Sequence, residues 1–343
     1  MPGMPGSQGA QSTLTDAPET PARVRGRLAP SPTGFLHLGN AWTFLLCWLA
    51  TRSQNGTLVL RMEDIDPERS RPEFAEAIMR DLDWLGLEWD EGPDVGGPYG
   101  PYVQSMRLDR YADIITMLTD CGYVYPCYCT RKELRSLASA PHMDDCGPVY
   151  PGTCRGLSVQ ERAEREASGK RAALRLRCDA SDLCFTDSLK GLVCRDWNSC
   201  GGDFAVRRSD GVFAYQLAVA VDDADQAITQ VVRGDDILLS TPRQIWLLRL
   251  MGAALPQYMH VPLVFDSEGA RLAKRHQHYE LRALREAGVA PEHIIGYLAF
   301  RAGLQPELAP LRPQALVRDF RPQALPGAPV LLEDDIFDRL RTL

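Results

Sequence analysis

The sequence lacks any apolar segment long enough to cross a membrane as a helix. No run among its 343 residues approaches about 18 uncharged apolar positions, and residues 1–22 have neither the basic start nor the apolar centre of a secretion signal. This N-terminal segment is poor in bulky apolar side chains, so burial cannot offset the entropy lost on ordering it. We therefore expect a disordered tail over residues 1–22, a cytoplasmic protein and no membrane partner.

An excess of positive charge is also missing. The chain has 38 Lys and Arg against 45 Asp and Glu, a formal net charge of −7, whereas indiscriminate nucleic-acid binding depends on clustered basic residues. A local basic face is still allowed. The ten cysteines lack the regular spacing of a disulfide framework, and without an export signal they indicate reduced thiols or metal ligands.

What is present is an alternation of strand and helix patterns from residue 23 to residue 120. Short β-leaning segments at 24–28 and 57–62 flank a strongly apolar helix at 41–50. Amphipathic helices follow near 70–85, with Ser70 and Glu73 as a capping box, and at 104–121. This order predicts the first half of a doubly wound, Rossmann-type parallel α/β sheet.

The loop between the first strand and the first helix has the sequence RLAPSPTGFLHLGN, residues 27–40. Its prolines and glycines break any helix, and His37, Gly39 and Asn40 stand at the start of the apolar helix. Backbone amides and the positive end of a helix dipole meet there, which suits a phosphate. A lone His-x-Gly would more often be an ordinary loop histidine.

Additional motifs favour the functional interpretation. HLGN resembles the HIGH signature of class I aminoacyl-tRNA synthetases, and RLAPSPTG and RMEDIDPER resemble segments of their glutamate-specific branch. The resemblance implies ATP binding by His37, Gly39 and Asn40, with His37 and Asn40 catalytic. It also implies that the bound glutamate contacts Arg27, Leu28, Ala29, Pro30, Ser31 and Glu63, and that Glu63 meets its α-amino group.

Cysteines concentrate in residues 121–212, which we interpret as an insertion. Cys127, Cys129 and Cys154 are a credible set of zinc ligands, and on chemical grounds His142, Cys146 or Tyr150 could complete a tetrahedral site, with N and S ligands preferred. The C-x-C and Y-x-x-x-C pattern resembles the zinc motif of the glutamyl-Q tRNA(Asp) synthetases, a family within the same branch. That resemblance implies one structural Zn²⁺ held by Cys127, Cys129, Tyr150 and Cys154. No chemistry is assigned to Cys178, Cys184, Cys194 or Cys200.

The parallel sheet is expected to resume over residues 213–275. VFAYQLAVAVDD, residues 212–223, is predicted as an apolar strand carrying Tyr215, and a strand at 228–233 ends at Arg233. Both segments resemble the glutamyl and glutaminyl branch, which implies that Tyr215 and Arg233 contact the amino acid. RLAKR, residues 271–275, resembles the KMSKS loop, with Lys274 as its catalytic, ATP-binding lysine and with Arg271 and Ala273 departing from the motif.

After Lys274 the sequence predicts a helical C-terminal region and a Pro-rich tail over residues 276–343. This length leaves no room for a large anticodon-binding region, which again resembles the glutamyl-Q tRNA(Asp) synthetases. The resemblance implies tRNA-independent formation of glutamyl-adenylate from L-glutamate and ATP with Mg²⁺, then transfer to queuosine in the anticodon loop of tRNA(Asp). We expect a monomer. Two alternatives remain, a truncated glutamyl-tRNA synthetase that charges tRNA(Glu), and an inactive RNA-binding module.

Overall fold

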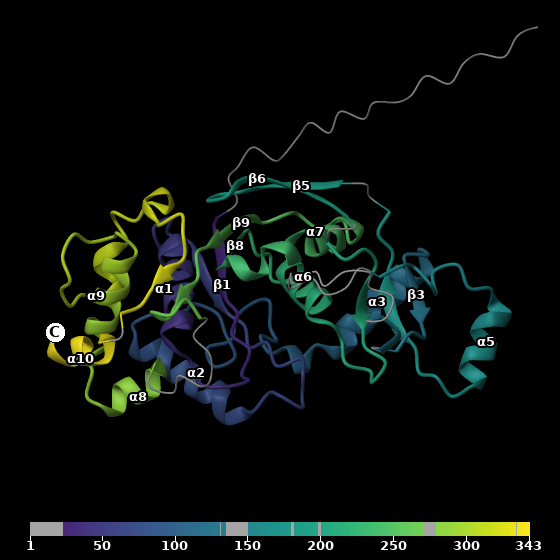
Figure 1. The fold of residues 1–343 in the computed structure, drawn as a ribbon, viewed down its shortest axis with the longest axis horizontal. Coiled ribbons are helices and arrows are strands. Elements are labelled where there is room, and N and C mark those ends of the chain that lie inside the picture. The colour runs from purple at the N-terminus through teal and green to yellow at the C-terminus, as the bar shows by residue number, and fades with distance from the viewer. Residues whose placement is uncertain are drawn as a thin grey trace, which may run out of the picture.

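The fold is elongated, with an α/β core at its centre (Figure 1). The computed structural model describes residues 23–130, 132–134, 150–179, 182–197, 200–270, 279–333 and 335–343. The C-terminal helices lie at one end of the long axis, and the element around β3 and α5 lies at the other. The predicted tail at 1–22 lies outside the described residues.

The first strand–helix–strand unit forms as predicted. Strand β1 (Arg25–Leu28) pairs in parallel with β2 (Thr57–Leu60), and α1 (Leu38–Arg52) connects them. Helix α1 is apolar around most of its circumference, and ten of its fifteen residues are buried. It therefore lies inside the core, where it holds its N-terminal end rigidly beside the ends of the strands.

A second unit of the same kind completes the α/β core. Strand β8 (Gln230–Gly234) pairs in parallel with β9 (Gln257–Val261), with α7 (Thr241–Leu250) between them. Strand β8 lies beside β1, where the amide of Thr229 donates to the carbonyl of Arg25 at 3.0 Å. The two units thus face each other across β1 and β8, which confirms the predicted Rossmann-like α/β fold.

Two local predictions were wrong. Residues 215–225 form helix α6 (Tyr215–Asp225), not a strand. The prediction failed because the run from Leu217 to Val221 is apolar and buried on all sides, so its pattern shows neither a helical nor a strand period. Helix α2 (Pro72–Trp84) has Arg71 as its N-cap without a side-chain bond, so Ser70 does not cap it. Pro72 is suited to the first helical position and holds the preceding residue extended.

The described part of residues 121–212 contributes one small sheet of its own and a hairpin that extends another sheet. Strands β3 (Val124–Cys127), β4 (Ala173–Leu176) and β7 (Phe204–Arg207) form an antiparallel sheet. Helix α5 (Val159–Ala167) begins with a capping box of Ser158 and Glu161. Strand β5 (Asp182–Asp187) forms a hairpin with β6 (Gly191–Asp196) and joins the edge of the β8–β9 sheet beside β9. The hairpin therefore shares a core with β8, β9 and α7.

Cys184 and Cys194 form a disulfide, so the expectation of reduced thiols was wrong for this pair. They lie directly opposite each other in the β5–β6 register, with their Cα atoms 4.1 Å apart. Sequence spacing alone does not reveal such a cross-strand pairing, because it depends on the register of the hairpin.

The remaining elements cover the ends of the core. The 3₁₀ segment η1 (Gln104–Met106) leads into α3 (Leu108–Asp120), and η2 (Asp235–Ser240) leads from β8 into α7. At the C-terminal end the elements are α8 (Leu281–Glu286), α9 (Pro291–Arg301), 3₁₀ turns at 313–316 and 322–324, β10 (Val264–Phe265) paired with β11 (Val330–Leu331), and α10 (Ile336–Thr342).

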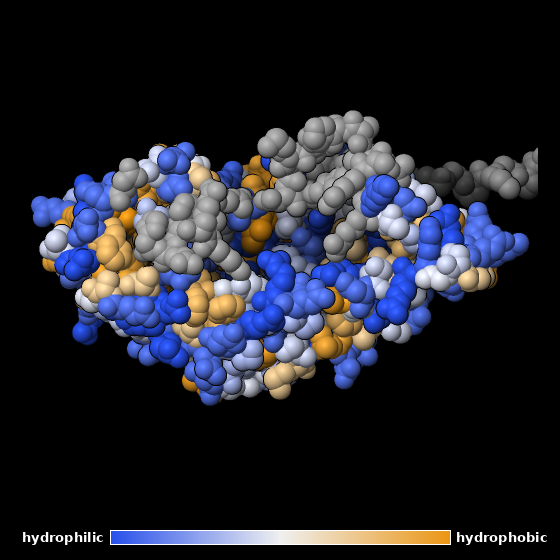
Figure 2. Space-filling model, turned by 60° about the horizontal axis from the view of Figure 1, so that its bottom comes forward, coloured by the Kyte–Doolittle hydropathy of each residue, from blue (hydrophilic) through white to orange (hydrophobic). Residues whose placement is uncertain are grey.

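The outer surface shows no large apolar face in the view of Figure 2, where hydrophilic residues predominate and hydrophobic ones form separate patches. Among the residues that the structure describes, no helix has both the length and the apolar character to cross a membrane.

Candidate active site

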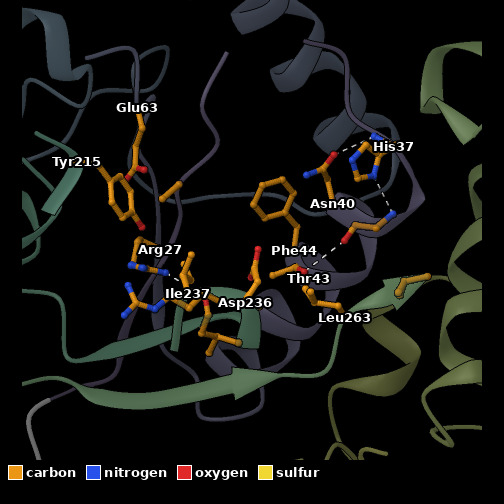
Figure 3. Close-up of a pocket in the computed structure, with 16 residues that line it drawn as sticks. Arg27, His37, Asn40, Thr43, Phe44, Glu63, Tyr215, Asp236, Ile237 and Leu263 are labelled. Carbon is orange, nitrogen blue, oxygen red and sulfur yellow. Dashed lines mark hydrogen bonds between the residues drawn. The ribbon is translucent and has the colours of Figure 1, made fainter. Parts of the chain in front are cut away.

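A cavity of about 340 Å³ lies where the carboxyl ends of β1 and β8 meet the start of α1. In open α/β sheets this edge is where ligands bind. Eight of the residues singled out in the sequence line it, namely Arg27, Ala29, His37, Gly39, Asn40, Glu63, Tyr215 and Arg233. Figure 3 shows Glu63, Tyr215 and Arg27 at one end of the cavity and His37 and Asn40 at the other.

Three other predicted residues that the structure describes do not line this cavity. Leu28 is a fully buried core residue, Pro30 is buried, and Ser31 is exposed. Lys274 lies outside the described residues, as do Arg271 and Ala273.

The His37 end of the cavity is built by a capping box at the start of α1. His37 Nδ1 accepts from the amide of Gly39 at 3.1 Å, and the amide of His37 donates to Asn40 Oδ1 at 3.0 Å. The amide of Gly39, which was expected to face a phosphate, therefore donates to the His37 ring within this cap. Because Nδ1 is an acceptor, a neutral His37 ring carries its proton on Nε2. An N–H donor of this kind, beside the positive end of a helix dipole, can meet a phosphate oxygen.

Glu63 supplies the negative charge at the opposite end. Its Oε1 accepts from buried Arg61 at 3.1 and 3.3 Å, and Arg61 also pairs with Asp223 at 2.8 Å. Burial raises the pKa of Glu63, although the nearby charges of Arg61 and Arg27 oppose the rise. Burial also raises the pKa of Tyr215, and the charge of Glu63 adds to that rise. Tyr215 is thus a neutral hydroxyl beside a carboxylate that can hold an ammonium group.

Two guanidinium groups lie at the same end. Arg27 Nε is 3.4 Å from Asp223 Oδ1, and its Nη1 donates to the carbonyl of Val232 at 3.1 Å. Arg233 donates instead to neutral acceptors on His260, Gln244 and Thr241. Two arginines and one glutamate in one cavity suit a ligand with two carboxylates and one ammonium group.

The remaining lining residues were missed in the sequence. Thr43 and Phe44 follow Asn40 by three and four positions on α1, so the helical period places them on the same face. Two side chains pack closely against Gly234, since a Cβ there would lie 2.6 Å from Asp236 Oδ1 and 2.7 Å from Leu263 Cδ2. The others are Val232, Asp236, Ile237, Leu263 and Val264. No local motif signals their approach.

A second cluster lies at the far end of the molecule. The sulfur atoms of Cys127, Cys129 and Cys154 all lie within 4.8 Å of one another, and Cys127 and Cys154 are buried. The Tyr150 hydroxyl is 3.4 Å from Cys127 Sγ and accepts from the amide of Cys154 at 2.8 Å. Zn–S bonds of about 2.3 Å in a tetrahedron separate the sulfurs by just under 4 Å, so the cluster fits zinc. His142 and Cys146 lie outside the described residues.

The comparisons with known proteins agree with this geometry. Residues 23–310 match the family model described as the catalytic domain of class I tRNA synthetases (E and Q). The chain is 58% identical over 318 residues to a glutamyl-Q tRNA(Asp) synthetase of Nitratidesulfovibrio vulgaris, covering 93% of this chain and 98% of the relative. It is 40% identical over 319 residues to a glutamate–tRNA ligase of a Sulfurihydrogenibium species, of which it covers 65%.

Among solved structures, a glutamate tRNA ligase from Elizabethkingia meningosepticum in complex with its amino acid superposes with a TM-score of 0.79 at 26% identity. The match covers 93% of this chain and 68% of that one. The likeness therefore extends over both halves of the sheet and the elements between them.

Proposed function

This chain belongs to the class I aminoacyl-tRNA synthetases of the glutamate and glutamine branch, and from that premise we propose that it glutamylates queuosine in tRNA(Asp). In the first step the glutamate α-carboxylate attacks the α-phosphorus of ATP, which forms glutamyl-adenylate and releases pyrophosphate. This step needs no tRNA. In the second step a hydroxyl of the queuosine ring attacks the activated carbonyl and displaces AMP.

The placement of opposite charges within one cavity supports glutamate as the amino acid, and the similarity to a glutamyl-Q tRNA(Asp) synthetase over 98% of that relative supports the acceptor. Arg27 and Arg233 would face the two carboxylates of glutamate, and Glu63 would hold its ammonium group. Tyr215 would add an orienting hydrogen bond. Glutamine would present an amide in place of one carboxylate and leave a charged donor partly unpaired, at a cost of about 1–3 kcal/mol.

At the other end the ATP triphosphate would lie along the start of α1, beside His37 and Asn40, as its Mg²⁺ complex. The residues of this chain would act by aligning the reactants and by stabilising charge on the phosphates. Lys274 would complete the phosphate contacts from the KMSKS-like loop. Ser31 would add a contact to the amino acid when the ligand is bound.

One Zn²⁺ would be held by Cys127, Cys129, Cys154 and Tyr150. When bound, the metal would cross-link a small element whose own core is a cluster of a few residues around these ligands. Its role would be structural, because none of these four residues lines the cavity. They belong to the element around β3 and α5, at the end of the long axis opposite α8 and α9 (Figure 1).

The direct test is ATP-dependent transfer of labelled glutamate to three RNAs, tRNA(Asp) with queuosine, tRNA(Asp) with guanosine at that position, and tRNA(Glu). Label on the first alone is the expected result. Label on tRNA(Glu) would instead support the charging reaction of the glutamate–tRNA ligase relatives. Glutamate-dependent exchange of pyrophosphate into ATP, without tRNA, separates either enzyme from an inactive RNA-binding module.

A further inference from the structure

Arg233 is held at the cavity by three neutral acceptors. Its Nε donates to His260 Nε2 at 3.0 Å, its Nη1 to Gln244 Oε1 at 2.7 Å and its Nη2 to Thr241 Oγ1 at 2.8 Å. A guanidinium has five N–H groups, so one N–H on each terminal nitrogen is left for a ligand. Within the part of the chain that the structure describes, no carboxylate forms an ion pair with Arg233.

The other buried arginines near the cavity differ in this respect. Arg61 pairs with Glu63 and with two aspartates, and Arg27 lies 3.4 Å from Asp223. Their charges are therefore partly neutralised within the protein. Arg233 keeps its full charge in a buried position, and burial of an unneutralised charge is costly unless a ligand or the surroundings compensate.

His260 is the acceptor for the Nε–H group of Arg233. The ring is fully buried, its Nδ1 lies 2.7 Å from Asp187 Oδ2, and its Nε2 faces the Arg233 Nε–H group. The carboxylate of Asp187 requires a proton on Nδ1, and the guanidinium requires a lone pair on Nε2, so both neighbours select the same neutral tautomer. Burial first, and then the charge of Arg233, lower the pKa of His260 to about 4, although Asp187 opposes this.

Asp187 is itself fixed by the hairpin that follows it. Its Oδ1 accepts from the amides of Leu189 and Lys190, both at 2.9 Å, and its Oδ2 accepts from the amide of His260 at 3.1 Å. Lys190 closes the turn through an ion pair with Asp235 at 2.9 Å. The carboxylate of Asp187, at the end of β5, thus lies in the sheet behind Arg233, which faces the cavity.

We propose that Asp187 and His260 are positioning residues for glutamate recognition: Asp187 fixes His260 as a hydrogen-bond acceptor, and His260 fixes the guanidinium of Arg233 toward the substrate carboxylate. The inference rests on the proposed function, in which Arg233 binds glutamate. No proton moves in this arrangement. Its effect is on glutamate affinity and on the preference for glutamate over glutamine, since both depend on the direction of the two remaining N–H groups.

The variant Asp187→Asn tests this, because it is isosteric and can donate to His260 Nδ1. The ring would then carry its proton on Nε2 and lose its acceptor role toward Arg233. In glutamate-dependent pyrophosphate exchange we expect KM for glutamate to rise about tenfold or more, with KM for ATP within about twofold of wild type. Asp81→Asn, a buried carboxylate paired with Arg285 between α2 and α8, is the matched control and should leave KM for glutamate unchanged.

Rescue separates positioning from a general loss of structure. The conservative variant His260→Gln keeps both contacts, because the Gln amide can donate to Asp187 and its carbonyl can accept from Arg233, so KM for glutamate should stay near wild type. If Asp187→Asn does not fold, His260→Leu removes the acceptor directly and should raise KM for glutamate alone. A wild-type KM in Asp187→Asn and His260→Leu overturns the inference. Absence of exchange in the wild type would instead refute the proposed function.

Discussion

The hydroxyl of Tyr150 lies 3.4 Å from the sulfur of Cys127, inside the cluster formed with Cys129 and Cys154. Its backbone donor is the amide of Cys154, so the phenol oxygen has a lone pair directed into the cluster. The face of the Tyr150 ring is covered by the guanidinium of Arg175 at 3.9 Å, which holds the ring in this orientation.

We therefore predict that removing this hydroxyl weakens zinc binding without disturbing the ring packing. Tyr150→Phe should lose zinc to a chelator at least about tenfold faster than wild type, and Cys154→Ser should contain none after purification. Metal content is measured by elemental analysis. Tyr128→Phe, which removes a hydroxyl that bonds Glu166 in the same small core, is the control. If Tyr150→Phe retains zinc as well as the wild type does, the fourth ligand is His142 or Cys146 and not Tyr150.

Neutralising Glu63 should weaken binding of the amino acid and not of ATP. The substitution Glu63→Gln removes a charged acceptor from the cavity, and hydrogen bonds to charged groups contribute about 1.5–3 kcal/mol, so KM for glutamate should rise at least about tenfold in pyrophosphate exchange. Arg61 would still be paired with Asp222 and Asp223, so the fold should be retained. Exposed Glu68→Gln is the control. An equal rise in KM for ATP would contradict the assignment.

His260 should make the protein less stable in mild acid. Its pKa is lowered from 6.5 to about 4 in the folded state, so between these values only the unfolded chain binds the proton. The free energy of unfolding should therefore fall as pH decreases from about 6.5 toward 4, by up to about 1.4 kcal/mol per pH unit. Asp187 does not contribute here, because its folded pKa is lowered from 3.8 and it stays ionised in both states.

Urea unfolding at pH 7 and pH 5 measures this dependence, and His260→Gln should reduce the difference between the two values. The charged groups that face the ring are Asp187 and Arg233, and Asp235 acts on it from a greater distance. The ring of Tyr258 stacks on His260, and the Thr241 hydroxyl lies 3.1 Å from its Nε2. An undiminished pH dependence in His260→Gln would assign the effect to other residues.

The Cys184–Cys194 disulfide should be detectable in protein purified without reductant. Trypsin cleavage after Arg177, Lys190 and Arg195 gives peptides 178–190 and 191–195, which should remain linked until a reductant is added. Cys178 lies in the first peptide and is free in the structure, so it provides an internal control for alkylation of the denatured chain. Separate, alkylated peptides without reduction would show that the pair is not joined.

The start of the fold was predictable because its signals are local. A short β-leaning segment, a loop rich in proline and a long apolar helix specify β1, the loop and α1, and the motif around His37 falls at the junction. The helical period could also have identified Thr43 and Phe44 as neighbours of Asn40. By contrast, Tyr215 was assigned to a strand, because a short run that is apolar on all sides fits a buried strand and a buried helix equally well.

The residues that face the cavity could thus be predicted from short motifs, because each motif is a local pattern of residue types and spacings. The residues that hold these side chains in place could not. Asp187, His260 and Arg233 are separated by up to 73 residues, and they meet only because β5 joins the edge of the sheet beside β9 and β8. Strand register and long-range pairing depend on the packing of the whole core. They bring Asp187 of β5 behind Arg233, which faces the cavity, and this contact cannot be read from any single segment of the sequence.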